Sequence, residues 1–233
     1  IPWRGRSAAS VFAEMRELSD KHRVRNIVFR DPLFAGSRER TLQLCGLIEA
    51  ARLPLKWQCG RAIKTLDEEV RGAMARAGCV SVSFGVESGN DELQKKYSRG
   101  KIKTWEHAKV VVDTCRKHGM ATRGFFMIGF PEETPEQARQ TMDLAVFLDP
   151  DSVQFTAVTP YPDTKLYKES RAGREEDFDY SKFSGTTPVG VARAMSDTQV
   201  SAHIRKAYRR FYMRPSRLLK ELRRPQLLLQ RAR

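Results

Sequence analysis

Several short segments of this 233-residue sequence are rich in β-branched residues, as strands are, and end in charged or polar residues. Glu87 comes directly after one such segment, 79–86, and Ser88 follows it. A carboxylate beside a hydroxyl at a strand end can hydrogen-bond to ribose hydroxyls or to an amine. A helix N-cap and a surface salt bridge are the ordinary alternatives for Glu87, and both stay open.

Two more strand ends carry candidate ligand contacts. Arg123 lies inside the expected strand 120–128, where a charge is costly unless it is paired or faces the mouth of a barrel. Gly129 and Phe130 follow that strand, and Pro131 completes a tight turn whose backbone groups can hydrogen-bond to a ligand. An ordinary turn before a helix has the same glycine requirement.

Strand-like and helix-like segments must position these residues, and they alternate along most of the chain. The expected strands are 24–29, 55–59, 79–86, 120–128 and 152–158, and the expected helices are 7–20, 37–51, 66–77, 104–118 and 135–148. Ser7 is the expected N-cap of the first helix, and Gly78 and Gly119 are expected C-caps.

Alternation in units of about 30 residues predicts parallel βαβ packing, as an open sheet or as a (β/α) barrel with about five parallel strands. The segment after the first strand lacks the glycines of a GxGxxG fingerprint, which disfavours a dinucleotide-binding fold. In both remaining architectures, ligands bind at the carboxyl ends of the strands.

The βα pattern stops near Arg171, so we expect a domain at 1–170 and a mostly helical extension at 171–233. The net charge is +14, and residues 200–233 hold eleven Lys or Arg against one acid. With Tyr208, Phe211 and Tyr212, these cations define an alternative function, a non-catalytic module that contacts RNA or a membrane surface. Of these two contacts, nucleic acid is the less favoured.

The four cysteines, at positions 45, 59, 79 and 115, match no zinc or redox spacing. We expect them to be buried thiols, and therefore expect a reducing, cytoplasmic location. No apolar run reaches the roughly 20 residues that a membrane-spanning helix needs.

Three motifs in order resemble the radical S-adenosylmethionine (radical SAM) superfamily. They are Phe84-Gly85-Val86-Glu87-Ser88-Gly89-Asn90, Gly124-Phe125-Phe126-Met127-Ile128-Gly129-Phe130-Pro131-Glu132-Glu133-Thr134, and Asp151-Ser152-Val153-Gln154-Phe155. The resemblance covers about residues 1–170 and implies a partial (β/α) barrel of the radical SAM type. It is greatest to the branch that often carries a cobalamin-binding domain, which includes the anaerobic magnesium-protoporphyrin ester cyclases and hopanoid-modifying enzymes.

The resemblance implies roles for individual residues in binding S-adenosylmethionine (SAM). It places Asp31 near the methionine amino group, and Glu87 and Ser88 near the ribose or the methionine. Arg123 and Gln154 are weaker candidates for the same ligand.

The family's GxIxGxxE pattern implies an adenine contact on the next strand. Gly129 and Phe130 would contact the adenine. Met127 takes the Ile position of the pattern, and Glu132 takes the Glu position.

The resemblance also implies cofactors and partners. Besides SAM, the family uses a [4Fe–4S] cluster held by a CxxxCxxC loop, which this sequence lacks, so we expect a fragment whose cluster ligands lie elsewhere in the parent protein. The implied reaction is reductive cleavage of SAM to a 5′-deoxyadenosyl radical that acts on a small molecule, and a hydrophobic substrate is left open. Cobalamin-dependent methylation or cyclisation is left open. An electron donor such as flavodoxin or ferredoxin would be a partner, and the basic tail leaves open contact with the inner membrane face.

Overall fold

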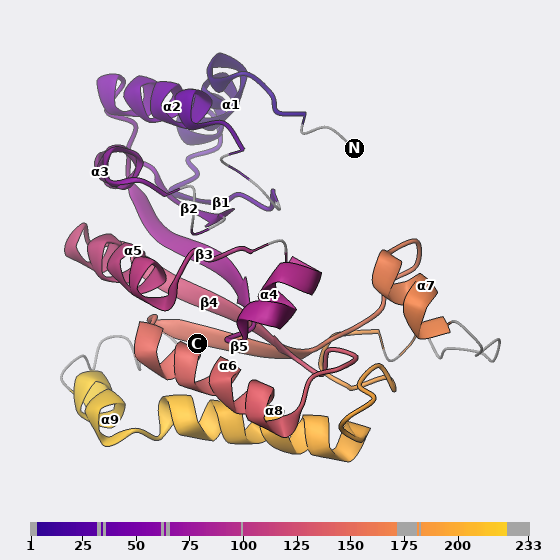
Figure 1. The fold of residues 1–233 in the computed structure, drawn as a ribbon. Helices are drawn as coiled ribbons and strands as arrows, with labels where there is room; N and C mark the ends of the chain where they lie inside the picture. Colours follow the sequence, from indigo (N-terminus) through magenta and orange to yellow (C-terminus); the bar gives the residue numbers. More distant parts are fainter. Residues whose placement is uncertain are drawn as a thin grey trace. The chain divides into compact units, whose positions relative to one another are not determined.

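The strands of this computed structural model follow one another across a single sheet. The structure describes residues 4–31, 34, 36–61, 63, 66–98, 100–171, 181 and 183–222. Five parallel strands lie in the order β1-β2-β3-β4-β5: Asn26–Val28, Lys56–Arg61, Cys79–Glu87, Ala121–Ile128 and Ser152–Ala157. Helices connect them (Figure 1). The predicted α/β fold of the partial-barrel type is therefore confirmed.

Nine helices are seen in the described residues. They are α1 Ala8–Asp20, α2 Arg38–Ala50, α3 Glu68–Arg76, α4 Asp91–Ser98, α5 Trp105–Lys117, α6 Pro135–Leu148, α7 Lys165–Arg171, α8 Asp197–Tyr212 and α9 Pro215–Leu222. The sequence did not predict α4, whose eight residues include only one short apolar pair, Leu93 and Tyr97. The last part of the helical extension expected at 171–233, residues 223–233, lies outside the described residues.

The chain divides into two compact units, and we describe each by itself. Unit 1 comprises residues 1–86, 101–124 and 148–152, and unit 2 comprises residues 87–100, 125–147 and 153–233. This division does not test the domain boundary expected near Arg171, which stays a prediction.

Local signals in unit 1 place its helices. The Ser7 side chain accepts a hydrogen bond from the Ser10 amide at 3.2 Å, and thereby caps the first turn of α1. Gly78 and Gly119 have φ values of +86° and +74°, as expected of glycines that end helices. At Gly78 a Cβ would also lie 2.5 Å from the Leu55 carbonyl oxygen, so a larger residue does not fit there.

In unit 2 two tyrosines of α8 cover the outer edge of β5. The Tyr208 hydroxyl accepts a hydrogen bond from the Phe155 amide at 3.0 Å and donates to the Phe155 carbonyl at 3.3 Å. Tyr212 makes the same pair of bonds with Val153, at 3.1 and 3.4 Å. Figure 1 shows α8 running alongside α6, and Arg210 of α8 forms an ion pair with Asp143 of α6.

The aromatic side chains of α8 therefore take part in the packing and hydrogen bonding of unit 2. Phe211 is fully buried, and both phenol hydroxyls are bonded to β5. The RNA or membrane alternative used these three aromatic side chains as contacts, and the structure packs them inside unit 2 instead. The exposed cations of α8 remain at the surface, including Arg205, Lys206 and Arg209.

Replacing either tyrosine should weaken the fold. We expect Tyr208→Phe or Tyr212→Phe to lower the free energy of unfolding by about 1 to 2 kcal/mol, because a strand N–H and C=O lose their partner. Urea unfolding of each variant measures this. Tyr161→Phe is the matched control, because the Tyr161 hydroxyl donates to the Phe183 carbonyl oxygen at 3.2 Å on an exposed side chain, where a hydrogen bond should contribute little. Equal stability of all three variants would contradict a structural role for the α8 hydroxyls.

Candidate functional site

Glu87, the last residue of β3, has a strained backbone. Its φ is +71°, in the left-handed region that residues with a Cβ rarely adopt. This conformation costs roughly 1 kcal/mol for a residue other than glycine. Such strain concentrates where a side chain must be held for binding or catalysis, so the backbone geometry supports the functional interpretation of Glu87.

The two residues after Glu87 are fixed against α6. Ser88 is fully buried, and its hydroxyl lies 3.3 Å from the Thr141 hydroxyl. The Gly89 amide donates to the same Thr141 oxygen at 3.0 Å, and the Asn90 amide donates to the Ser88 hydroxyl at 3.1 Å. Ser88 therefore holds the backbone beside Glu87, a role that its position next to Glu87 in the sequence did not reveal.

Gly89 is needed because a neighbouring backbone approaches it closely. A Cβ at this position would lie 2.3 Å from the Gln140 carbonyl oxygen and 2.7 Å from the Thr141 nitrogen. Real Cβ atoms do not approach backbone atoms so closely, so only glycine fits without movement of α6. The sequence reasoning did not single out Gly89, although the glycine after Glu87-Ser88 was visible.

The turn after β4 is held by Glu133. One carboxylate oxygen accepts hydrogen bonds from the amides of Gly129 and Phe130, the latter at 3.2 Å. Gly129 has a φ of +100°, and a Cβ there would lie 3.1 Å from Val200 of α8. The predicted tight turn is therefore present, and its backbone is fixed from both sides.

Glu133 is an unusual carboxylate. It is fully buried, and its second oxygen has no hydrogen-bond partner among the described residues. Burial in an apolar environment disfavours the charged form and raises the pKa of Glu133 to about 7, although the two amide bonds oppose this. Near neutral pH the group is therefore close to its midpoint of ionisation.

Glu132, which the resemblance assigned to the Glu position of the family pattern, behaves differently. Its carboxylate forms an ion pair with Lys96 at 2.9 Å and accepts a hydrogen bond from the Tyr97 hydroxyl. Its side chain is 48% exposed, so it belongs to the surface of unit 2. Of the two adjacent acids, Glu133 is the one that contacts the turn, and the sequence offered no local signal to tell them apart.

The other candidate residues occupy different places. Gln154 lies half-buried on β5 in unit 2, in the alternating pattern of that strand. Arg123 is an exposed residue of β4 in unit 1. Unit 2 thus contains five of the seven candidates, at positions 87, 88, 129, 130 and 154.

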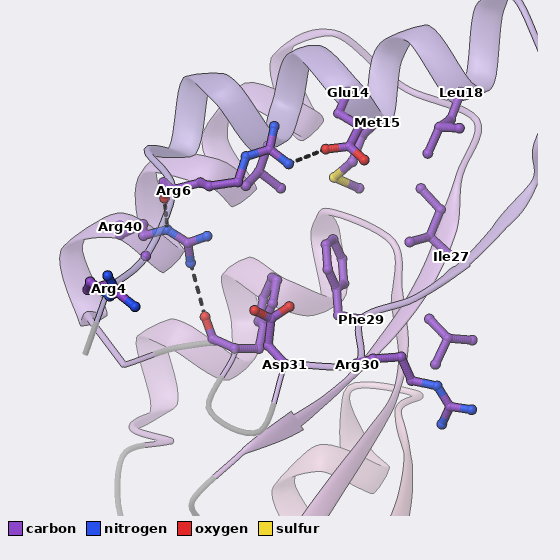
Figure 2. A pocket seen from close by; sticks show the side chains of 14 residues that line it. Arg4, Arg6, Glu14, Met15, Leu18, Ile27, Phe29, Arg30, Asp31 and Arg40 are labelled. Carbon is purple, nitrogen blue, oxygen red and sulfur yellow. Dashed lines mark hydrogen bonds and ion pairs between the residues drawn. The ribbon is translucent and has the colours of Figure 1, made fainter. Parts of the chain in front are cut away.

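Asp31 lines a cavity of about 490 Å³ in unit 1. In Figure 2, α1 lies above this cavity, and Phe29 and Asp31 lie below it. Arg6 pairs with Glu14 at the rim, and Arg40 donates to the Phe34 carbonyl oxygen at 3.0 Å. The Asp31 carboxylate thus borders a cavity in which Arg6 is already paired with Glu14 and Arg40 already donates to a backbone carbonyl.

The described residues do not suit an iron–sulfur cluster. Among them, no group of Cys, His, Asp and Glu is arranged to hold a metal ion. All four cysteines are buried and free, as expected. Burial raises the pKa of Cys115 to about 12, and the hydrogen bond with Cys59 together with burial raises the pKa of Cys79. These groups stay thiols, whereas cluster ligands are thiolates.

Comparison with known proteins identifies the family. A family model described as the radical SAM superfamily matches residues 2–145. The chain is 33% identical over 221 residues to an uncharacterized methyltransferase of Pyrococcus horikoshii, and the match covers 94% of this chain and 48% of the relative. It is 27% identical over 216 residues to the anaerobic magnesium-protoporphyrin IX monomethyl ester cyclase of Cereibacter sphaeroides, covering 91% of this chain and 35% of that protein.

A solved structure agrees with these matches. The radical SAM methyltransferase TsrM of Kitasatospora setae, solved with cobalamin and a [4Fe–4S] cluster bound, superposes with a TM-score of 0.60 at 27% identity. The match covers 65% of this chain and 31% of that protein. The chain spans about half the length of the methyltransferase relative and about a third of the other two. With more than half of its residues matched by the family model, the chain belongs to the radical SAM superfamily.

Proposed function

We propose that this chain is the SAM-holding part of a radical SAM enzyme that methylates or cyclises a small organic molecule with the help of cobalamin. The observation that carries the proposal is the strained backbone of Glu87 at the end of β3, with Ser88 and Gly89 locked against α6 behind it. A fold accepts such strain where it presents a side chain to a ligand.

Each candidate residue has a part in this proposal. Glu87 accepts hydrogen bonds from ribose hydroxyls or from the methionine amine, and Gln154 contributes a further polar contact. Gly129 and Phe130 contact the adenine edge, in a turn that Glu133 holds in place. In unit 1, Asp31 accepts from the methionine amine, and Arg123 is a second, weaker contact.

The cofactors supply the difficult chemistry, and the protein orients them. SAM, when bound, supplies one-electron or methyl-transfer chemistry. Two relatives support the type of reaction, because one is named a cyclase of a porphyrin ester and another was solved with cobalamin bound. We propose that the cluster ligands lie outside the described residues, because no described set of side chains suits them.

The surroundings of the enzyme are part of the proposal. A flavodoxin or ferredoxin would deliver the electron, and the substrate would be a hydrophobic small molecule. In the described residues no helix is both long enough and apolar enough to cross a membrane. We propose a cytoplasmic enzyme, with 1–170 as its barrel part and 171–233 as a basic extension that can approach the inner membrane face.

The proposal is tested at Glu87 in the full-length protein. Glu87→Gln should weaken SAM binding about 10-fold or more, because hydrogen bonds to a charged acceptor contribute about 1.5 to 3 kcal/mol. Isothermal titration with SAM measures the affinity. Glu92→Gln is the matched control, an exposed acid of α4 that should leave the affinity unchanged.

Two outcomes would count against the function. Equal SAM affinity of Glu87→Gln and the unmodified protein would remove Glu87 from the site. A full-length protein, reconstituted anaerobically with iron and sulfide, that releases neither 5′-deoxyadenosine nor S-adenosylhomocysteine from SAM would contradict the enzyme assignment itself.

A further inference from the structure

The short helix α4 is bonded to the turn that follows β3. The Gln94 side-chain amide donates a hydrogen bond to the Ser88 carbonyl oxygen at 2.6 Å. Gln94 is 3% exposed and Ser88 is fully buried, and a hydrogen bond is stronger in such a low-dielectric environment than in water. At its start, α4 is capped by the Asn90 side chain, which accepts from the Leu93 amide at 3.1 Å. The helix is thereby attached to the residue next to Glu87.

The same helix packs against the turn that follows β4. The Tyr97 ring stacks on the Phe130 ring, with ring centroids 5.0 Å apart and an angle of 24° between the planes. Leu93 lies four residues before Tyr97, on the same face of α4, and belongs to the same apolar cluster as Phe130. Because Phe130 is itself buried, the position of its ring depends on these two side chains of α4.

Glu132 adds a polar contact between α4 and this second turn. The Tyr97 hydroxyl donates to one oxygen of the Glu132 carboxylate, and the Lys96 ammonium pairs with the other oxygen at 2.9 Å. About half of both charged side chains is exposed, and exposed ion pairs contribute little to stability. We therefore expect the stacked rings of Tyr97 and Phe130 to be the stronger contact.

The helix α4 thus contacts two turns that have different parts in the proposed SAM site. Glu87 in the first turn is assigned to the ribose or the methionine, and Gly129 and Phe130 in the second turn are assigned to the adenine. Both turns and α4 belong to unit 2. A helix attached to both turns fixes the distance between them before the ligand arrives, and such preorganisation lowers the cost of binding.

We propose that α4 fixes the spacing of the two SAM-binding turns, with Gln94 as a positioning residue for Glu87 and Tyr97 as a positioning residue for Phe130. Gln94 acts through the Ser88 carbonyl group, and Tyr97 acts through the Phe130 ring. Neither side chain needs to touch SAM. The inference rests on the proposed function, because it takes both turns to bind SAM.

The SAM affinity of the full-length protein, measured by isothermal titration, tests the role of Gln94. Gln94→Met keeps the approximate size of the side chain and removes the donor. It should weaken SAM binding about 5-fold, the effect expected from the loss of one buried hydrogen bond. Lys95→Met is the matched control, because Lys95 is the exposed next residue of α4 and should leave the affinity unchanged. Equal affinities of the two variants would overturn the role of Gln94.

Two substitutions at Tyr97 separate the ring from the hydroxyl. Tyr97→Leu removes the stacked ring and should weaken SAM binding about 3- to 10-fold. Tyr97→Phe keeps the ring and loses only the bond to the exposed Glu132, so its affinity should stay within about 2-fold of the unmodified protein. If Tyr97→Leu binds SAM as tightly as Tyr97→Phe, the ring contact does not position the turn.

A double-mutant cycle distinguishes positioning from a general loss of stability. Glu87→Ala removes the side chain that Gln94 is proposed to position, so Gln94→Met should weaken SAM binding less than about 2-fold in that background. Additive losses would show that Gln94 does not act through Glu87, and would overturn the inference while leaving the SAM site in place. Failure of the proposed function gives a different result, because Glu87→Ala alone would then leave the affinity unchanged, and the inference would fall with it.

Discussion

Gly89→Ala is expected to lower the free energy of unfolding by about 3 kcal/mol or more. The added Cβ would lie 2.3 Å from the Gln140 carbonyl oxygen, and backbone atoms of a helix cannot move aside as a flexible side chain can. Overpacking of this kind costs about 1 to 3 kcal/mol, and a clash with backbone belongs at the upper end. Urea unfolding followed by circular dichroism measures the change.

The chain offers a matched control for this substitution. Gly46 lies in α2, and a Cβ there meets nothing within 4 Å. Gly46→Ala should raise stability by up to about 1 kcal/mol, because alanine favours a helix more than glycine does. If Gly89→Ala proved as stable as Gly46→Ala, the close approach of α6 to the β3 turn would be wrong.

Gly89→Ala should also affect SAM binding. The clash displaces either α6 or the turn that contains Ser88, and the Glu87 backbone is held by that turn. We expect the affinity of the folded variant for SAM to fall at least as much as in Glu87→Gln. Unchanged affinity would separate the packing of Gly89 from the proposed role of Glu87.

Glu133→Gln should abolish a pH dependence of stability. The pKa of Glu133 is raised from 4.5 to about 7 in the folded protein. The unfolded state therefore loses its proton first, and the free energy of unfolding falls as pH rises from about 4.5 to about 7. The loss amounts to about 3 kcal/mol, since each pKa unit corresponds to about 1.4 kcal/mol.

The glutamine variant stays neutral and keeps an oxygen for the amides of Gly129 and Phe130. We expect it to match the unmodified protein near pH 4.5 and to be more stable by up to about 3 kcal/mol at pH 8. Urea unfolding at half-unit intervals of pH gives the two curves, whose difference isolates Glu133 from the other carboxylates. Glu132→Gln is the control, because Glu132 precedes Glu133 in the chain but is exposed and paired with Lys96. Parallel curves for Glu133→Gln and the unmodified protein would contradict the raised pKa.

Local sequence signals predicted the elements of this fold well. Ser7 caps α1, Gly78 and Gly119 end their helices, and the expected strands are present in chain order. These features depend on a few neighbouring residues, so a short window contains the necessary information. The short helix α4 was missed because its apolar residues are too few to form a recognisable stripe.

Contacts between distant residues account for most of what the sequence did not predict. Gly89 meets Gln140, and Tyr208 meets Phe155, across some fifty positions of the chain. The adjacent acids Glu132 and Glu133 have the same chemistry, and only the folded turn shows which one is buried. The proposed ligand roles of Asp31, Glu87, Arg123 and Gln154 remain predictions, to be measured by the experiments above.

The two tyrosines of α8 can both bond to β5 because four residues of a helix and two residues of a strand cover nearly the same length. Four helical residues rise about 6 Å, and two strand residues advance about 6.6 Å. Side chains at positions 208 and 212 therefore meet alternate residues of β5 with little accumulated offset. For a third tyrosine one turn further along the helix, the offset between its hydroxyl and the matching strand residue would be larger. Helical phenol ladders of this kind can therefore terminate short strands only, which gives a length limit for anyone who designs a sheet with a helix as its boundary.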